Sequence, residues 1–503
     1  MKGFVCLFGS DAVWRFMTNR VFAPLETRHE VTYVALRWGE LMTQASRNGD
    51  LESDGRKVVW LPGYSHRNKR WNELFNISCI THQDRSSSFA VRVEEQARQD
   101  PSTFARLERL ARPGRYEQYR RIMEHRLGAH PELLELTRRE RPDFFVLPSK
   151  LQDGLTHDAL QLADQLKIPT LMLVSTWDNL SSKGLLFHRP TVIGCLGEQS
   201  RRHAIDVQGM EPHQVCVVGA PQYERFRDPP PIDRAAVRAS LGVPPMVPLI
   251  LFAGALRPFD ETDVLQTVDQ AIEDGTLPSL HLLYRPHPWR SAREQEANFF
   301  DVVWRHVTMD PQLAAFYRMT KEQRRRFTTD NLLFELAHLL QVYQVVDAVI
   351  SPMSTVLLEA MLVGVPTMAV AFGDGKHSWS PEKVSRMLHF KEFYEVPDLI
   401  LCQRRDDFEG AVCRLVAQIG DEPLRNRLRE QSRYFLYQDQ RSYGERVLEA
   451  LELMLARVES TPEYDSVRLR PGSRFAIEEW MSPRAIQDAM KRLLGASPPT
   501  VAE

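Results

Sequence analysis

The chain lacks long hydrophobic runs, an excess of either charge and closely spaced cysteine pairs. No apolar stretch approaches the roughly 20 residues that a membrane-spanning helix needs, and the short apolar run before Asp11 is expected to be a strand rather than a signal peptide. Lysine and arginine number 64 against 66 acidic residues, so a formal net charge of −2 gives no global field that attracts nucleic acid. We expect a cytoplasmic protein, either free or at the inner face of the plasma membrane.

The six cysteines are scattered and form no CxxC pair. This pattern argues against a zinc site or a disulfide scaffold and fits a reducing compartment. The chain of 503 residues exceeds one ordinary core, and its apolar content of 43% is normal for a globular protein. We therefore expect two domains of α/β size with additional segments.

Short apolar runs that alternate with helical patterns predict a parallel sheet in each half of the chain. In the first half, strands are expected at Gly3–Phe8, Val31–Leu36, Val58–Leu61, Phe144–Leu147, Leu171–Val174, Val192–Cys195 and Val215–Val218. In the second half, they are expected at Leu249–Ala253, Leu280–Tyr284, Ala348–Ile350, Thr367–Ala371 and Leu399–Cys402. The expected fold class is α/β, with two doubly wound, Rossmann-like domains facing each other across a cleft.

Three consecutive prolines, Pro229–Pro231, separate the two halves and predict a stiff linker. We expect an N-terminal domain over residues 1–228 and a C-terminal domain over residues 229–455. Residues 294–341, which are charged and helical in pattern, are expected to be an insertion in the second domain. Residues 456–503 are expected to be a C-terminal extension.

The stretch Val349–Phe372 predicts a buried strand, a polar turn, a helix and a second buried strand. Ser351, Ser354 and Thr355 fall where a helix N-terminus presents free N–H groups, a pattern that favours phosphate binding. Glu359 lies one turn into the helix on the face of Thr355, where it could accept hydrogen bonds from a ribose. A nucleoside diphosphate would fit this arrangement.

A second motif, Tyr284–Trp289, follows a predicted strand and reads YRPHPW. The two prolines restrict the backbone around His287, which places its imidazole to bind a phosphate or a pyrimidine carbonyl. Arg285 and Arg290 could add charge-assisted contacts. The alternative is a histidine that serves only the structure of a turn.

Several carboxylates of the first half could act as a general base. Asp178 follows a predicted buried strand, with Lys183 as an anion contact, and the alternative is a helix cap. Asp11 follows the first strand. Asp153 and His157 form a third choice, and only geometry can decide among these groups.

The His-Pro motif and the Ser/Thr turn with its downstream glutamate resemble the nucleotide-binding domain of GT-B glycosyltransferases. The resemblance is to bacterial capsule and wall-polymer enzymes: CDP-glycerol glycerophosphotransferases, capsule Kdo transferases and His-Pro-motif sialyltransferases. Val217–Tyr223, Gln438–Arg446 and Ser175–Gly184 are similar to further segments of such enzymes. The resemblance implies that Arg441 and Ser442 lie near the donor. Ser351 stands where these enzymes often have an acidic residue, which leaves the donor's identity open.

The resemblance implies a sugar transferase whose N-terminal domain faces the acceptor and whose C-terminal domain binds the donor. The expected partners are a nucleotide-sugar and a polysaccharide or glycolipid acceptor, with no nucleic acid. Donor contacts are expected from Arg285, His287, Ser351, Ser354, Thr355, Glu359, Arg441 and Ser442, and the base from Asp178 or Asp11. No cofactor and no metal ion are expected. Alternatives are CDP-glycerol or polyol phosphate transfer, non-hydrolysing UDP-sugar 2-epimerisation and an inactive assembly subunit.

Overall fold

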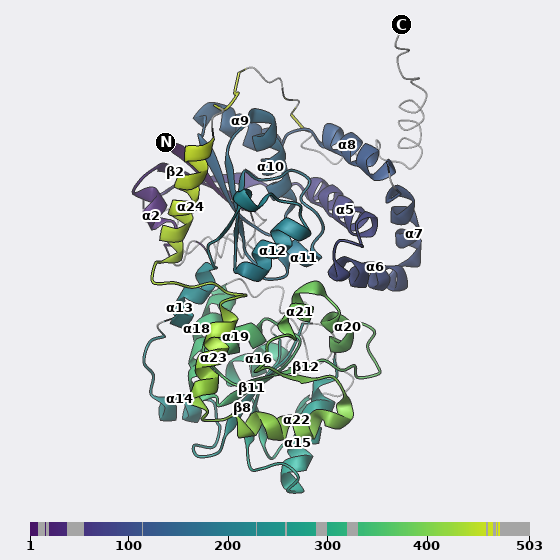
Figure 1. Cartoon of the computed structure of the whole chain (residues 1–503), viewed down its shortest axis with the longest axis vertical. Coiled ribbons are helices and arrows are strands. Elements are labelled where there is room, and N and C mark those ends of the chain that lie inside the picture. The colour runs from purple at the N-terminus through teal and green to yellow at the C-terminus, as the bar shows by residue number, and fades with distance from the viewer. Residues whose placement is uncertain are drawn as a thin grey trace.

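The computed structural model describes two α/β bodies that lie one above the other along the longest axis (Figure 1). The residues described are 1–8, 16, 20–37, 55–112, 114–227, 229–256, 259–287, 299–318, 330–458, 461–465, 469 and 471–472. Asp11, Arg290 and the last thirty-one residues (473–503) lie outside these residues, so the predictions made for them stay predictions.

The first sheet has seven parallel strands in the order β3-β2-β1-β4-β5-β6-β7. The strands are β1 (Lys2–Leu7), β2 (Glu30–Arg37), β3 (Lys57–Pro62), β4 (Phe144–Ser149), β5 (Thr170–Val174), β6 (Val192–Cys195) and β7 (Val215–Val217). All seven were expected from the sequence. The order reverses between β1 and β4, which is the switch point of a doubly wound sheet.

Helices cover both faces of this sheet. They are α2 (Ala23–Glu26), α5 (Ser65–Thr81), α6 (Ser87–Gln99), α7 (Pro101–Leu110), α8 (Arg115–Leu127), α9 (Pro131–Glu140), α10 (Gly154–Leu166), α11 (Asn179–Ser182), α12 (Glu198–Asp206) and α13 (Glu224–Arg227). The helices α5 to α8 form an arm at one side of the domain (Figure 1).

The second sheet has six parallel strands in the order β10-β9-β8-β11-β12-β13. The strands are β8 (Leu249–Ala253), β9 (His281–Arg285), β10 (Val307–Met309), β11 (Ala348–Pro352), β12 (Thr367–Val370) and β13 (Ile400–Cys402). Numbered along the chain, this order is 3-2-1-4-5-6, the Rossmann order, with its switch point between β8 and β11. Two facing domains of this kind form the expected GT-B fold.

The helices of the second body are α14 (Arg234–Ser240), α15 (Glu261–Glu273), α16 (Pro311–Arg318), α18 (Asp330–Val345), α19 (Val356–Leu362), α20 (Pro381–Ser385), α21 (Leu388–Phe393), α22 (Phe408–Ala417) and α23 (Glu422–Ser432). Residues 294–341 were expected to be a helical insertion, and that expectation is wrong. Within them, β10 is the third strand of the sheet, and the chain returns through α18 to β11. Such a crossover is part of the doubly wound pattern.

Both sheets are buried on two faces, which explains why their strands are almost continuously apolar. In β1, Val5 and Leu7 pack on one side while Phe4 and Cys6 pack on the other. The alternation follows from the period of two residues in a strand. Aspartate or serine side chains cap several helices at the N-terminus, for example Asp260 on α15 and Ser442 on α24 (Tyr443–Arg457).

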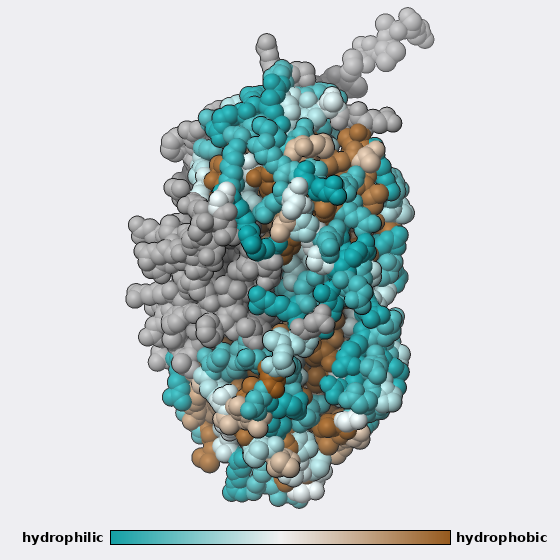
Figure 2. Space-filling model, turned by 90° about the vertical axis from the view of Figure 1, so that its left-hand side faces the viewer, coloured by the Kyte–Doolittle hydropathy of each residue, from teal (hydrophilic) through white to brown (hydrophobic). Residues whose placement is uncertain are grey.

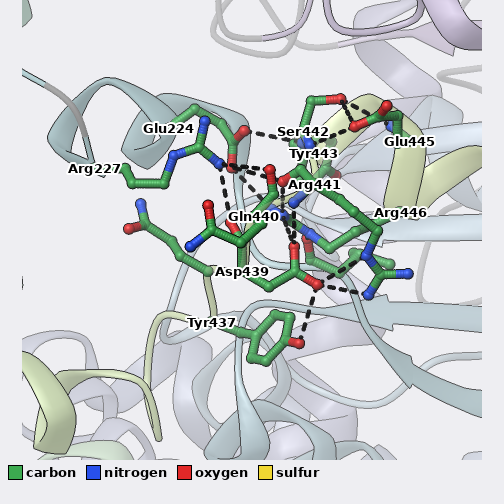
Figure 3. A network of polar contacts seen from close by, with 12 residues as sticks. Glu224, Arg227, Tyr437, Asp439, Gln440, Arg441, Ser442, Tyr443, Glu445 and Arg446 are labelled. Carbon is green, nitrogen blue, oxygen red and sulfur yellow. Dashed lines mark hydrogen bonds and ion pairs between the residues drawn. The ribbon is translucent and has the colours of Figure 1, made fainter.

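Helix α24 crosses back and packs against the first domain (Figure 1). Tyr443, Val447 and Leu451 of this helix share a core with residues of β1. The crossing is fixed by Arg446, which is only 3% exposed. Its guanidinium contacts Glu224 at 2.8 Å and Asp439 at 3.0 Å and donates to the Val218 carbonyl (Figure 3).

The carboxyl ends of the two sets of strands face each other. Ser378, in the loop after β12, lies against Glu95 and Arg98 of α6 in the first domain. From the other side, Trp177, in the loop after β5, packs against α21 of the second domain. The loops after the strands therefore line the region between the domains, where ligands of doubly wound sheets bind.

Gly219 provides a test of the crossing. Its φ is +81°, and a Cβ there would lie 2.4 Å from the Tyr437 carbonyl oxygen. Gly275 also has a positive φ of +72°, but a Cβ there meets nothing within 4 Å. We expect Gly275→Ala to lower the free energy of unfolding by about 1 kcal/mol through backbone strain alone, and Gly219→Ala by at least about 2 kcal/mol. Urea titration followed by circular dichroism measures both, and equal losses would contradict the close approach.

Candidate functional site

The switch point of the second sheet is built by Ser351 at the end of β11. Its hydroxyl donates to the Ala253 carbonyl of β8 at 2.7 Å and lies 2.8 Å from the hydroxyl of Ser354. Ser351 is buried, whereas Ser354 is half-buried. The Ser/Thr turn of the sequence analysis thus sits on the crevice between β8 and β11, the place where a doubly wound sheet binds a ligand.

Thr355 begins α19 as its N-cap residue, and its side chain makes no capping hydrogen bond. The residue is exposed. Helix α19 has only seven residues, so its dipole is a small part of any anion affinity. Binding at this turn would depend on hydroxyls and backbone N–H groups more than on the helix.

Glu359 accepts a hydrogen bond from a residue of α18. The hydroxyl of Tyr343 donates to Glu359 at 3.0 Å and contacts the Val356 carbonyl at 3.3 Å. Burial, together with Glu359, raises the pKa of Tyr343 well above its usual value, so the phenol stays a donor. The contact fixes one oxygen of Glu359 in place, which is the kind of support that a ligand-binding carboxylate needs. Nothing in the local sequence around Glu359 indicates this support, because Tyr343 lies in another helix.

Arg285 is buried at the end of β9 and contacts Asp310 at 2.5 Å. Asp310 in turn lies 2.9 Å from Nε2 of His338. Burial alone would raise the pKa of Asp310, but His338 and Arg285 hold it below its usual range. A large part of the Arg285 charge is therefore balanced within the protein. His287 is half-buried two residues further on, at the same edge of the sheet.

The loop after β12 adds a charged cluster. Asp374 accepts hydrogen bonds from the backbone N–H groups of Asp260, Lys376 and His377, and it contacts the His377 ring. Burial opposes these contacts, but they lower the pKa of Asp374 to about 2. Lys376 reaches Asp260 at 2.7 Å. The cluster ties the loop after β12 to the N-terminus of α15.

On the first domain, Trp177 is almost fully buried among four aromatic rings. His389, Phe390 and Phe393 of α21 and Phe435 lie 5.0–6.1 Å from its ring centroid. Its indole N–H donates to Gln199, whose amide donates to the His389 carbonyl at 3.0 Å. The Ser175–Gly184 segment therefore supplies the apolar contact between the domains, a role that its sequence did not reveal.

Asp178, the next residue, is half-buried and contacts Lys183 at 2.9 Å. It also accepts hydrogen bonds from Ser182 at 3.0 Å and Thr176 at 3.1 Å. Burial would raise the pKa of Asp178, yet Lys183, His389 and Ser182 lower it below the usual range. Asp178 is thus ionised, but these partners reduce its affinity for a proton.

The third candidate pair lies in the core of the first domain. His157 is buried among Trp71, Phe75 and Phe187, with Nε2 2.7 Å from the Leu151 carbonyl. Burial lowers the pKa of His157 to about 4. Its surroundings are those of a structural histidine. Asp153 precedes α10 without capping it through its side chain.

Arg441 and Ser442 lie at the crossing to α24. Ser442 caps α24 and shares a capping box with Glu445. Arg441 contacts Asp439 and Glu449, both at 2.6 Å (Figure 3). None of these contacts joins either residue to the Ser351 turn. Their donor role stays a prediction that comes from the resemblance.

Within the described residues, no group of three or more His, Cys, Asp or Glu side chains could hold a metal ion. No helix in the described part of the chain combines the length and apolar character that crossing a bilayer requires.

No protein-family model matches the chain, and no curated protein matches its sequence. Solved structures similar to it include S. aureus MnaA with UDP, at 12% identity over 92% of this chain and 99% of that chain, with a TM-score of 0.49. A UDP-GlcNAc 2-epimerase from Neisseria meningitidis bound to UDP-GlcNAc shares 10% identity over 90% and 100% of the chains, with a TM-score of 0.49. A glycosyltransferase from Rickettsia africae shares 10% over 91% and 98%, with a TM-score of 0.45. At these values we draw no functional conclusion from the likenesses.

The buried His389 predicts a pH dependence of stability. Burial lowers its pKa to about 3, whereas an unfolded histidine has a pKa of about 6.5. Between these values the unfolded chain binds the extra proton, so stability falls as the pH falls. One such histidine should lower the free energy of unfolding by about 2 kcal/mol between pH 7 and pH 5.

Urea titration at both pH values measures this effect. His389→Gln should show a loss that is smaller by about 2 kcal/mol than that of the parent protein. His213→Gln, at an exposed position, is the control and should behave as the parent does. Identical pH dependence in all three proteins would contradict the assignment.

Proposed function

We propose that the protein is a nucleotide-sugar enzyme whose second domain binds the nucleoside diphosphate. One observation carries the proposal. The hydroxyls of Ser351 and Ser354 lie at the switch point between β8 and β11, on the edge that faces the other domain. This is the position at which doubly wound sheets bind nucleotides.

The neighbouring strands supply groups that suit the rest of such a ligand. Thr355 is exposed beside the crevice, and Glu359 is held by Tyr343. His287 lies two residues beyond the end of the adjacent strand β9, at the same edge. We assign the diphosphate to the Ser/Thr turn, the ribose to Glu359 and a further polar contact to His287. With these donors aimed at the leaving group, the reaction needs no metal ion of its own.

We further propose that the reaction is sugar transfer to a polysaccharide or glycolipid hydroxyl in the region between the domains. A carboxylate of the first domain would take the proton of that hydroxyl. The loops after its strands face the donor edge, which supports this division of roles. Asp178 and Asp11 are the proposed bases, and the lowered pKa of Asp178 favours Asp11.

Epimerisation of a UDP-sugar and transfer of a polyol phosphate from CDP-glycerol are the alternatives, because the same crevice would serve them. Epimerisation needs no acceptor, so incubation with UDP-GlcNAc alone distinguishes it from transfer. Proton NMR would then detect the epimerised sugar. Incubation with CDP-glycerol and with UDP- or CMP-sugars plus a glycan acceptor separates the two transfers. A thermal-shift screen with CMP, CDP, UDP, GDP and dTDP identifies the nucleobase that the protein prefers. A ligand at 100 times its Kd stabilises the folded protein by roughly 2.7 kcal/mol, so the preferred nucleotide should give a clear shift.

The switch-point hydroxyls are tested by Ser354→Ala and Thr355→Val. Each should weaken binding of the selected nucleotide by about 1–2 kcal/mol, or roughly 5- to 30-fold in Kd, and leave the melting temperature unchanged. Ser240→Ala, on an exposed position of α14 in the same domain, is the matched control. Calorimetry measures the affinity. Unaltered affinity in both variants would overturn the assignment of the diphosphate.

The identity of the general base is tested by the variants Asp178→Asn and Asp11→Asn. One of these variants should lose about 10²- to 10⁴-fold in turnover with little change in donor affinity. Release of the nucleotide product measures turnover, and calorimetry measures affinity. Parental turnover in both variants would remove both residues from this role and direct the test to Asp153.

A further inference from the structure

A cavity lies outside the region between the facing strand ends. We call it the hinge pocket. It has a volume of about 870 Å³. Its wall includes residues of both connections between the domains: Arg227, Pro229, Pro231 and Ile232 of the first, and Gln438, Asp439 and Gln440 of the second. The amino ends of β11 and β12 and the helices α18, α19 and α23 complete it. It therefore lies at the opposite edge of the second sheet from Ser351.

The wall of the hinge pocket is strongly basic. Five arginines and only two aspartates line it, an excess of three positive charges on a protein whose net charge is −2. The arginines are Arg227, Arg234, Arg425, Arg429 and Arg433. Asp439 pairs with Arg441 and Arg446, whereas Asp347 accepts the backbone N–H of Leu249 at 2.8 Å and lies 3.5 Å from Arg234. Arg425 and Arg433 pair with glutamates of their own helix or its end, Glu422 and Glu430.

Arg429 is the arginine with the least compensation. It is half-buried against Gly364, and its guanidinium donates a hydrogen bond to the neutral amide of Asn426 at 2.8 Å. No carboxylate of the described residues forms an ion pair with it. Burial and the nearby Arg425 lower the pKa of Arg429, which means that an anion would be favoured there.

A second, independent feature is Gln344 at the end of α18. Its side-chain Nε2 is buried and has no hydrogen-bond partner among the described residues. A buried donor without a partner costs about 1–3 kcal/mol, and a ligand oxygen would remove this cost. Phe226, Tyr343 and Leu362 add apolar wall beside it. A cavity of this size, part apolar and part cationic, matches a small organic ligand.

We propose that the hinge pocket binds a soluble phosphorylated compound of about nucleotide size. Guanidinium groups bind phosphate oxygens in pairs, and several of them around one cavity favour a di- or polyphosphate. The pocket includes both connections between the domains. Arg227 already joins them, because its guanidinium donates to the Asp439 carbonyl at 2.9 Å (Figure 3). A bound anion holds the two connections together and so biases the relative position of the domains.

The pocket is also coupled to the donor site. Tyr343 contributes to its wall and donates to Glu359 at 3.0 Å. A ligand that shifts Tyr343 changes the support of Glu359. Coupling of this kind is reciprocal, so a nucleotide bound at the Ser351 turn changes the affinity of the hinge pocket for its own ligand.

Pyrophosphate is the probe for calorimetry, with saturating nucleotide present so that the Ser351 turn is occupied. We expect one site per chain. Arg429→Gln should weaken it at least tenfold, whereas Arg427→Gln, on the same helix but paired with Asp398 at 3.0 Å, should leave it unchanged. Ser354→Ala should also leave it unchanged, which separates this site from the proposed nucleotide site.

Hydrogen exchange on the parent protein gives a readout that does not depend on any variant. Pyrophosphate should slow exchange at Ile232 and Asp233 of the first connection, where Pro229–Pro231 carry no amide hydrogen, and in residues 437–441 of the second connection. Absence of a second binding event, equal weakening by Arg427→Gln, or protection confined to the Ser351 turn would each overturn the proposal. Binding to phosphatidylglycerol vesicles that Arg429→Gln abolishes, without pyrophosphate binding, would overturn the soluble ligand in favour of a lipid headgroup.

Discussion

A buried guanidinium fixes how the two domains meet. Arg446 is held between Glu224, at the end of the first domain, and Asp439, in the returning connection. With 3% exposure, it would be costly to bury without both carboxylates. The pair of ion contacts therefore sets where α24 begins and which way it returns to the first domain. Once that return is fixed, the two connections lie side by side and the strand ends face each other.

The opposite margin of the contact between the domains is apolar. Trp177 lies in a core cluster that includes residues of both domains, and the aromatic rings of α21 surround it. Beside it, Lys383 contacts Glu95 at 2.9 Å and Glu94 at 3.0 Å. Lys383 and Glu95 are both buried, so separating them would leave charges without their partners in a region of low solvent access, which is costly. Burial of the indole also stabilises the contact by several kcal/mol. Opening the domains would therefore require separating Trp177 from α21 and breaking the contact of Lys383 with Glu95.

Much of the fold could be predicted from the sequence, because buried parallel strands are short, apolar and bounded by turns. All seven strands of the first sheet and five of six in the second were found in this way. The exception, β10, contains only two apolar residues, Val307 and Met309, and is bounded directly by His306 and Asp310. The strands β7 and β13 are equally short, but each lies in a run of four apolar residues and was therefore detected. The site was predicted unevenly. Ser351 and Ser354 follow a strand directly, and the strand order brings them to the switch point. Tyr343 and Asp310 come from distant segments, and nothing in their local sequence indicates the contacts they make.

The two basic regions of the second domain differ in how their charges are balanced, and the difference has a physical consequence. At the carboxyl edge of the sheet, Arg285 faces Asp310, and Lys376 faces Asp260. Such internally balanced groups hold fixed positions without a ligand, which suits a site that must orient a reactive donor. In the wall of the hinge pocket the cations outnumber the carboxylates, and Arg429 donates to the neutral amide of Asn426 and forms no ion pair within the described residues. Uncompensated charge near a connection makes the arrangement of that connection depend on the anion concentration. The chain thus separates a preorganised carboxyl edge from an anion-responsive hinge, and Tyr343 contacts both.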